Sequence, residues 1–263
     1  MDAKNEDAIR GLIEAGSNIV GGATGGAVGF LVGGPVGAAV GGAAGAALPQ
    51  VFSKVGVELK QRLLGKREEM RIGAVFICAA KKIQVKLDEG QRLRNDGFFD
   101  EDDTGRSNAD EICEGVFLSA QKEHEEKKLK YYGNLLANIA FNHEIDKAQA
   151  NMMIKIADDL TYRQLCLIYI FFNKDNYKYN LSNNFSWTDS HPTPKGRMVS
   201  QEIFDMYSKG LVKCKDSGIY NTDNLVIPAK MRLTGGSLLY MLMELGDIER
   251  NDIDVVLPYL LSK

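Results

Sequence analysis

Apolar residues recur at the three- to four-residue spacing of an amphipathic helix through much of the chain beyond residue 53. Between Lys54 and Arg94 they alternate with charged residues, which predicts two helices joined near Gly65. The acidic run from Asn95 to Asn108 predicts a loop, and Ser107 near its end can cap the helix that follows. The pattern therefore predicts a helical body with one long polar connection.

The same spacing predicts a long helix from Ala109 to Asn142 and a further helix from Lys147 to Leu160. Thr161 is the predicted N-cap of the next helix, which runs from Tyr162 to Phe172. A central helical bundle is the expected product of these elements.

Residues 173–263 differ from the preceding residues in composition and in the pattern of apolar positions. The stretch from Asn173 to Lys195 is rich in Asn, Ser, Pro and Tyr and predicts an irregular connection. A turn at Asp216-Ser217-Gly218 lies between two short apolar runs, which favours a hairpin. The elements predicted after the irregular connection are a helix at Met198–Lys209, strands at Leu211–Cys214 and Leu225–Ile227, a helix at Ser237–Leu245 with Thr234 as N-cap, and a helix at Ile253–Leu261.

The stretch from Ala15 to Ser53 differs from everything after it, because thirty-nine consecutive residues carry no charge. Glycine returns at every fourth position, which places one row of glycines on one face of a helix. In water each interior glycine costs about 1 kcal/mol relative to alanine, whereas in lipid a bare face lets another helix approach closely. The predicted membrane-insertion and oligomerisation residues are Gly21, Gly25, Gly29, Gly33, Gly37, Gly41 and Gly45.

The stretch resembles the glycine-zipper segments of bacterial membrane and pore-forming proteins. A soluble glycine-mediated oligomer and a flexible linker are the alternatives. Its length suits two membrane crossings better than one, since one crossing needs about 20 helical residues. Gly33-Gly34-Pro35 is a plausible break, and basic residues flank the stretch on both sides, so a hairpin with both ends in the cytoplasm is expected. A single helix stays open.

Composition and charge limit the classes of function and the cellular compartment that we expect for this chain. The net charge of -3 argues against a general nucleic-acid binder. The four cysteines are far apart in the sequence and form no CxxC pair, which favours a reduced, cytoplasmic compartment. Residues 1–14 contain four acids and two bases, which is not the pattern of a secretory signal.

The order of elements from Thr161 to Leu245 resembles a winged-helix domain. In a winged helix that reads DNA, the second main helix carries Arg, Lys or Asn on its outer face. Here that helix offers Glu202 and Asp205 against Lys209. Protein contacts are therefore a better expectation for this domain than DNA, and a plain helical subdomain is the alternative.

Motifs for catalysis or metal binding are weak. Asp100 to Glu111 places Asp100, Asp102 and Thr104 at EF-hand spacing, but Ser107 stands where an apolar residue is usual and no second loop follows. A solvated acidic turn is the default interpretation. The three histidines lie far apart, and His124 sits in the charged run KEHEEKK, which favours a solvated face. No phosphate-binding or nucleophile motif occurs, so we expect no enzyme activity, no metal and no cofactor.

The runs EHEEKKLKYYGNLLANIAFN and DDLTYRQL, followed by RLTGGSLLYML, resemble the Abi-alpha family of bacterial abortive-infection proteins. The likeness covers about half of the chain, and its residues, Leu135, Leu136, Ala137 and Asn138 among them, are helix-packing residues. The resemblance implies a role in phage defence by damage to the host.

The sequence thus predicts a mainly α protein with a glycine-zipper helix or hairpin at 1–53, a helical bundle at 54–160 and a winged-helix-like α+β domain at 161–263. The expected function is a membrane-permeabilising effector of phage defence that acts by oligomeric insertion. Its expected partners are the lipid bilayer, further copies of the chain and a protein activator or inhibitor, and its expected location is the cytoplasm and the inner membrane. A non-enzymatic regulatory or interaction module, with the glycine stretch as anchor or oligomerisation segment, is the alternative.

Overall fold

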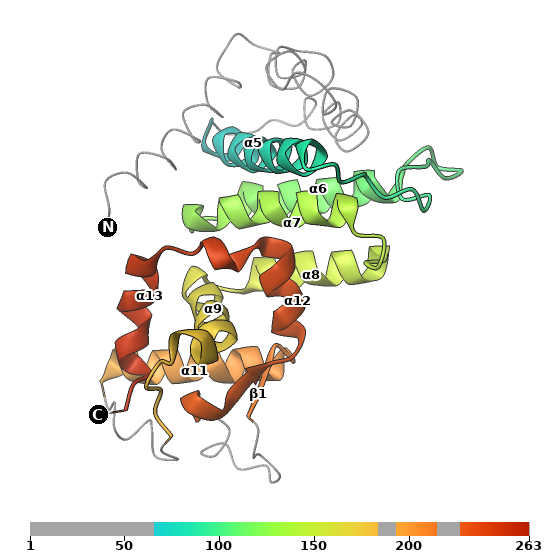
Figure 1. Ribbon diagram of the computed structural model, residues 1–263. Helices are drawn as coiled ribbons and strands as arrows, with labels where there is room; N and C mark the ends of the chain where they lie inside the picture. Colours follow the sequence, from blue (N-terminus) through green and yellow to red (C-terminus); the bar gives the residue numbers. More distant parts are fainter. Residues whose placement is uncertain (1–65, 184–192, 215–226, 263) are drawn as a thin grey trace. The chain divides into compact units, whose positions relative to one another are not determined.

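The computed structural model describes residues 66–183, 193–214 and 227–262, and these are mainly α-helical as predicted. The described residues up to Asp159 form one compact unit, and those from Leu160 onward form a second (Figure 1). The seven glycines, residues 54–65, the turn at Asp216-Ser217-Gly218 and His191 lie outside the described residues.

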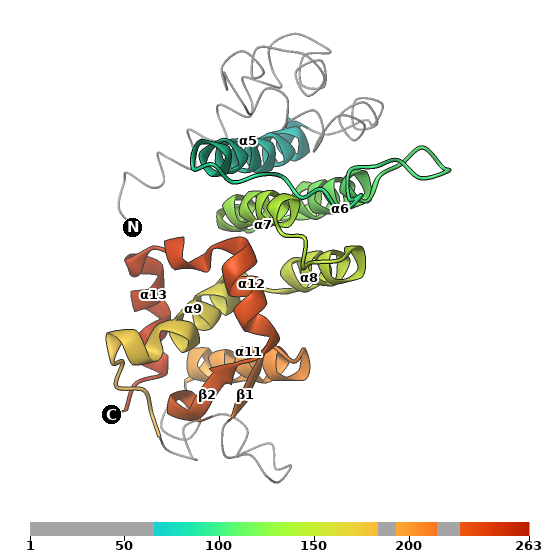
Figure 2. The same ribbon diagram turned by 45° about the vertical axis from the view of Figure 1, so that its right-hand side comes forward.

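The first unit is a stack of helices in three layers (Figures 1 and 2). The helix α5 packs on α6 and α7, and α6 packs in turn on α8. Eleven of the thirteen residues of α7 are buried, including Leu135, Leu136, Ala137 and Asn138, so α7 is the core of this unit. Its elements are α5 (Lys66–Asp88), α6 (Asn108–Lys122), the 3-10 turn η1 (Glu126–Lys128), α7 (Leu129–Phe141) and α8 (Lys147–Asp159).

The second unit is organised around α9, which contacts α11, α12, α13 and β2. Its two strands pair antiparallel with Val212 opposite Leu233, and Leu181 forms an isolated bridge with Leu261. Its helices and strands are α9 (Tyr162–Tyr177), α11 (Pro194–Ser208), β1 (Val212–Cys214), β2 (Met231–Leu233), α12 (Gly235–Met243) and α13 (Arg250–Val256). Its 3-10 turns are η3 (Pro228–Lys230), η4 (Leu245–Asp247) and η5 (Leu257–Tyr259).

Two predicted helix caps are confirmed. The Ser107 hydroxyl accepts a hydrogen bond from the Asp110 amide, and the Asp110 side chain accepts one from the Ser107 amide in return. Thr161 and Gln164 form the same reciprocal arrangement at the start of α9. Each pair satisfies two backbone donors that a helix start leaves without an intrahelical partner.

The single helix predicted from Ala109 to Asn142 is wrong, because the chain breaks into α6 and α7. Glu123 adopts an extended conformation at the end of α6, and its side chain is buried rather than solvated. The break lets α7 turn back and pack against α6, which buries apolar faces of both helices.

The helix predicted in the stretch that ends at Arg94 stops at Asp88, and Arg94 lies in the following loop. Its guanidinium donates to the carbonyls of Ile139 and Ile145, at 3.4 and 2.7 Å, and pairs with Asp96. The Arg94 side chain thus satisfies one carbonyl near the C-terminal end of α7 and one in the connection to α8, which is why a charged residue of an apparent helical pattern is buried there.

The helix predicted to end at Phe172 continues to Tyr177, so the first part of the predicted irregular connection is helical. Asn173 is buried and donates to the Tyr169 carbonyl and the Tyr240 hydroxyl. Lys174 donates to two carbonyls, that of Ala229 in η3 and that of Met231 at the start of β2. Polar residues that suggest a loop are thus used to join α9 to α12 and β2.

The remaining differences concern the end of the chain. The strand at 211–214 is confirmed over Val212–Cys214, but its partner is Met231–Leu233, and Ile227 lies before a 3-10 turn. The α11 helix begins at Pro194, capped by Thr193. Thr234 does occupy the N-cap position of α12, but its hydroxyl donates to the Gly210 carbonyl and accepts no capping hydrogen bond from an amide of its own helix. The predicted Ile253–Leu261 helix is shorter, because α13 ends at Val256 and Pro258 lies in the 3-10 turn that follows.

Candidate functional site

The seven predicted site glycines lie outside the described residues, and the described chain begins with α5. Among the described residues, α5 is the first helix after the glycine-rich stretch in the sequence, and the contacts that hold it in the first unit are described here as its anchor. Two features make up this anchor: a close helix crossing and a polar contact.

The close crossing joins α5 to α7 at Gly133. A Cβ atom placed on Gly133 would lie 2.5 Å from Cys78 Cβ and 2.9 Å from both the Val75 carbonyl oxygen and the Ala79 amide nitrogen. Two of these three neighbours are backbone atoms, which cannot move without shifting the helix. Glycine is needed here because the two helix backbones come too close for any side chain.

The polar contact joins Arg67, Glu68 and Arg71 of α5 to the end of α6 and to η1. Arg67 forms an ion pair with Glu126. The Gln121 amide donates to the Glu68 carboxylate at 3.2 Å, and the Arg71 guanidinium donates to the Gln121 carbonyl at 3.2 Å. The partners of α5 are thus Gln121, in the last turn of α6, and Glu126, in η1, and we call residues 121–128 the α6–α7 turn.

This turn is built on a buried ion pair. Lys128 Nζ lies 2.5 Å from Glu123 Oε2, and the two side chains are only 2% and 5% exposed. The other Glu123 oxygen accepts a hydrogen bond from the Glu125 amide at 2.8 Å. Both charges are thus compensated within the turn, which holds its backbone in one conformation.

Tyr132 joins the buried pair to α8. Its hydroxyl lies 3.4 Å from Glu123 Oε2 and 3.2 Å from the Ala157 carbonyl oxygen. Burial, followed by the nearby Glu123 charge, raises the pKa of Tyr132 well above its ordinary value. The hydroxyl therefore keeps its proton, and this one proton lies within hydrogen-bond reach of both acceptors.

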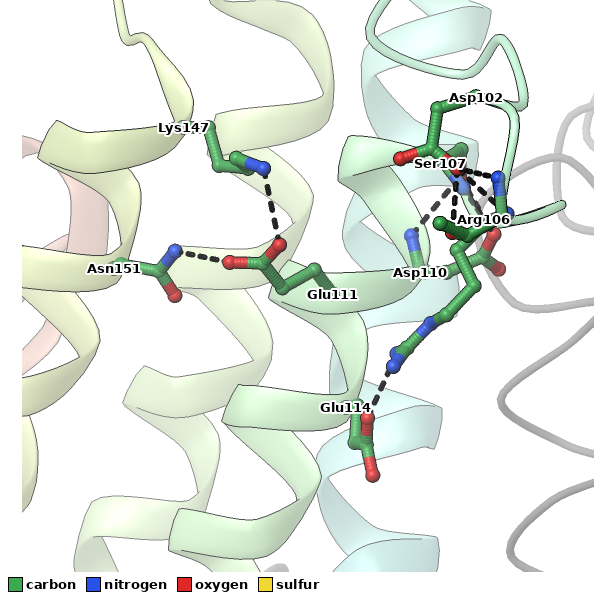
Figure 3. A network of polar contacts seen from close by, with 9 residues as sticks. Asp102, Arg106, Ser107, Asp110, Glu111, Glu114, Lys147 and Asn151 are labelled. Atoms are coloured by element: carbon green, nitrogen blue, oxygen red, sulfur yellow. Dashed lines mark hydrogen bonds and ion pairs between the residues drawn. The ribbon is translucent and has the colours of Figure 1, made fainter.

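A second polar network stands at the acidic loop (Figure 3). The Asp102 carboxylate accepts hydrogen bonds from the Thr104 hydroxyl, the Thr104 amide and the Arg106 amide, at 2.6, 2.9 and 3.3 Å. These bonds hold the pKa of Asp102 below its ordinary value. Asp102 thus closes its own loop, and Arg106 continues the network through an ion pair with Glu114 at 2.7 Å.

Glu111 lies on the other side of α6 and points toward α8 (Figure 3). Its carboxylate accepts from Asn151 at 2.6 Å and pairs with Lys147 at 3.2 Å. The structure therefore does not bring Glu111 and Asp102 together as an EF-hand loop would. Within residues 66–183, 193–214 and 227–262, no group of three or more His, Cys, Asp or Glu side chains could hold a metal ion.

The acidic side chains of α11 bond within the second unit. The Nε and Nη2 atoms of Arg163 each donate a hydrogen bond to the Glu202 carboxylate, at 2.7 and 2.9 Å. Asp205 accepts from Gln164 at 2.8 Å and pairs with Lys209 at 2.6 Å. Both carboxylates thus connect α11 to α9. Asp205 also holds Lys209, the residue that follows α11.

The remaining candidate side chains are scattered. His124 and His143 are exposed and lie on different turns of the first unit. All four cysteines belong to the described residues, and no disulfide joins any of them. Burial raises the pKa of the Cys78 thiol to about 11.

Sequence reasoning missed the Glu123–Lys128 pair, because the run KEHEEKK looks like a solvated helix face. Lys122 and His124 are exposed as expected, whereas Glu123 and Lys128 of the same run are buried. The one sequence signal is the charge-dense run itself, set between two apolar helical patterns where a chain reversal is possible.

Comparison with models of protein families, with curated proteins and with solved structures gives no match for this chain. Among the helices in the described part of the chain, none is both long and apolar enough to cross a membrane.

Proposed function

We propose that this chain is a membrane-permeabilising effector that acts by oligomeric insertion of its glycine-rich stretch. One observation carries the proposal: glycine occupies seven successive fourth positions, from Gly21 to Gly45, inside thirty-nine residues without charge. A row of this length is a surface for close helix packing, and lipid is the solvent in which such packing replaces the hydrophobic effect between helices.

The low hydrophobicity of the stretch favours insertion as an oligomer over insertion as a single copy. Phe30 and Leu31 are the only large apolar residues near its centre, so one copy gains little from entering lipid. Several copies that pack through their glycine faces gain van der Waals contact with one another. The helical conformation also gives the backbone N–H and C=O groups hydrogen-bond partners inside the lipid. The partners are thus the bilayer and further copies of this chain, and the place of action is the inner membrane reached from the cytoplasm.

The anchor of α5 supports a protein in which a folded body carries the membrane-inserting stretch. The Gly133 crossing ties α5 firmly to the first unit, so whatever enters the membrane stays attached to a folded body. In the second unit, the order α11, β1, β2, α12 supports a winged-helix-like domain. Because Glu202 and Asp205 of α11 bond within the unit, the support for a protein activator or inhibitor over DNA comes from the net charge of -3.

The resemblance to the Abi-alpha family supports phage defence as the setting. In abortive infection a cell that has been infected is damaged from within, and a protein that opens the inner membrane only on a signal has the required effect. No catalytic residue, cofactor or metal takes part in this proposal.

A leakage experiment tests it. Purified full-length protein is added to vesicles of phosphatidylethanolamine and phosphatidylglycerol that hold a self-quenched dye. We expect leakage from the natural chain and none from the Gly29→Leu/Gly37→Leu variant, because leucine forces the helix backbones apart while adding hydrophobicity. The matched control, Val28→Leu/Val36→Leu, changes the opposite side of the helix and should still open the vesicles.

Binding to the same vesicles is measured alongside leakage by flotation. The glycine-to-leucine variant should float with the vesicles at least as well as the natural chain. Membrane binding without leakage by the natural chain would favour the regulatory or interaction module with a glycine-zipper anchor. Equal leakage from both double variants would show that the glycine register is not an assembly surface.

A further inference from the structure

Five aromatic side chains gather on the second unit, where α9 packs beside α12 and α13 (Figure 2). Phe172 of α9 stacks on Tyr240 of α12, with ring centroids 3.8 Å apart. Tyr177, the last residue of α9, stacks on two further tyrosine rings, at 6.4 and 5.6 Å. We call this group the aromatic patch, and its members are Tyr169, Phe172, Tyr177, Tyr179 and Tyr240.

A buried amide joins the two stacks. Asn173 donates to the Tyr169 carbonyl at 3.0 Å and to the Tyr240 hydroxyl at 3.1 Å. Burial, followed by the neighbouring Tyr177 hydroxyl, raises the pKa of Tyr169, and Tyr240 adds to the same shift. Tyr169 therefore stays uncharged at neutral pH, and the two stacks form one connected patch.

The patch leaves aromatic surface in water. Phe172 is 42% exposed and Tyr177 is 55% exposed, and Met241, which follows Tyr240 on α12, is 58% exposed. Of the Phe and Tyr residues in the described part of the chain, none is more exposed than these two. Because burial of an aromatic ring is favourable, and because aromatic residues and methionine are enriched at protein interfaces, these side chains mark a surface for a partner.

The segments that carry the patch are acidic. Residues 172–179 and 240–254 hold four of the five rings, and they contain six acidic residues and three basic ones. Two of the bases have partners within the unit, because Lys174 donates to backbone carbonyls and Arg250 pairs with Asp254 at 2.8 Å. The charge of this surface therefore suits a cationic partner and disfavours an anionic one.

We propose that the aromatic patch is a docking surface for a protein segment that carries arginine or lysine. A guanidinium or an ammonium is attracted both to the face of an aromatic ring and to a carboxylate, and this surface offers both. The exposed Asp175 lies between Phe172 and Tyr177 in the sequence of α9. The inference goes beyond the proposed function and does not depend on membrane permeabilisation.

Arg250 shows how such a cation is held. The carbon of its guanidinium lies 5.5 Å from the centroid of the Tyr179 ring, and its Nη1 donates to the Tyr179 hydroxyl at 3.0 Å. Its Nε pairs with Asp254. One ring and one carboxylate thus hold a guanidinium at one edge of the patch, and α9 offers the same combination of residue types to a partner.

Two strained backbone positions border the patch. Lys178 and Glu244 have φ angles of 48° and 54°, and among the described residues no other residue except glycine has a positive φ. Lys178 caps α9 between Tyr177 and Tyr179, and Glu244 caps α12 four residues after Tyr240. Side chains disfavour the left-handed conformation, and strain of this kind gathers at functional sites. At Lys178 it accompanies a turn of the chain that stacks two rings close in sequence.

Fluorescence anisotropy with the full-length protein tests the proposal. The probe is a fluorescein-labelled peptide in which arginine alternates with glycine, and the matched peptide has glutamine in place of arginine. We expect the arginine peptide to bind at physiological salt and the glutamine peptide not to bind. Tyr177→Leu keeps an apolar side chain but removes the ring, and it should weaken binding about fivefold. Tyr177→Phe keeps the ring and should bind like the natural chain.

Two controls separate the patch from the rest of the surface. Met198→Ser changes a side chain of α11 that is 56% exposed, in the same unit, and should leave binding unchanged. Asp175→Asn should weaken binding about two- to fivefold, the effect of one exposed charge. Glu144→Gln removes a charge from an exposed position of the first unit and should have no effect. Circular dichroism checks that each variant keeps its helices.

Unchanged affinity in Tyr177→Leu would overturn the proposal, as would an equal loss in Met198→Ser or equal binding of the two peptides. If Tyr177 instead supports binding of oligouridylate or of phosphatidylglycerol vesicles, and the arginine peptide does not bind, the partner is a nucleic acid or lipid and the proposal is wrong. Self-association that Tyr177→Leu abolishes, without peptide binding, would also refute it. The proposed function is judged separately, by whether leakage depends on Gly29 and Gly37.

Discussion

Lys128 and Glu123 form an ion pair of 2.5 Å whose two side chains are almost completely buried, at a point where the chain reverses between two helices. Burial of a charge is costly in free energy, so such a pair persists only when each partner is satisfied. Here the Glu125 amide and the Tyr132 hydroxyl complete the surroundings of the carboxylate. The buried carboxylate is therefore satisfied by Lys128, the Glu125 amide and the Tyr132 hydroxyl together.

Removal of one partner of this pair should be strongly destabilising. Glu123→Gln leaves a buried ammonium and Lys128→Met a buried carboxylate, and we expect each to lower the free energy of unfolding by about 3–5 kcal/mol. The double variant carries neither charge and should lose less than the sum of the two. Urea unfolding of the four proteins measures the coupling. Additive losses would show that the two charges do not depend on one another.

Gly133→Ala should destabilise the first unit, although alanine is the better helix former by about 1 kcal/mol. Its Cβ would overlap Cys78 and the backbone of α5, and overpacking of this kind costs about 1–3 kcal/mol. Gly115→Ala in α6 is the control, since its nearest neighbour is a movable Ile154 methyl group at 3.4 Å. Thermal unfolding should separate the two variants, and an equal response would argue against the close crossing.

The decrease in the free energy of unfolding at acid pH should depend on Glu111. The Asn151 hydrogen bond, with a further contribution from Lys147, holds the pKa of Glu111 below its ordinary value. A carboxyl with a lowered folded-state pKa stabilises the fold above its ordinary pKa, and that contribution is lost as pH falls from about 5 downward. Glu111→Gln should therefore flatten the loss of unfolding free energy between neutral and acid pH. A Glu111→Gln protein with an unchanged acid limb would contradict this assignment.

The body should fold without the glycine-rich stretch. Deletion of Gly16 to Pro49 removes no residue of α5 or of any later described element, and α7 supplies a buried core to the first unit. We expect a soluble protein that retains its helical circular dichroism and elutes as a compact species. Aggregation with general loss of helical signal would mean that the stretch belongs to the core.

What the sequence determined by itself are features that depend on a few neighbouring residues. The caps at Ser107 and Thr161 were predictable, because a cap is a bond between a side chain and an amide three residues later. The helical character of most of the body was predictable for a similar reason, since an apolar face repeats within each turn. The glycine register is also a property of local spacing, and its role in membranes stays a prediction.

Only the tertiary structure decided where the long helical pattern breaks and which strand pairs with β1. The break at Glu123 depends on Lys128, Tyr132 and Ala157, which lie five, nine and thirty-four residues farther along the chain. Likewise, Asn173 lies in α9 and donates a hydrogen bond to the Tyr240 hydroxyl, 67 residues farther along the chain. Burial of a polar side chain is favourable only when distant partners meet it, and no local pattern of charges contains that information.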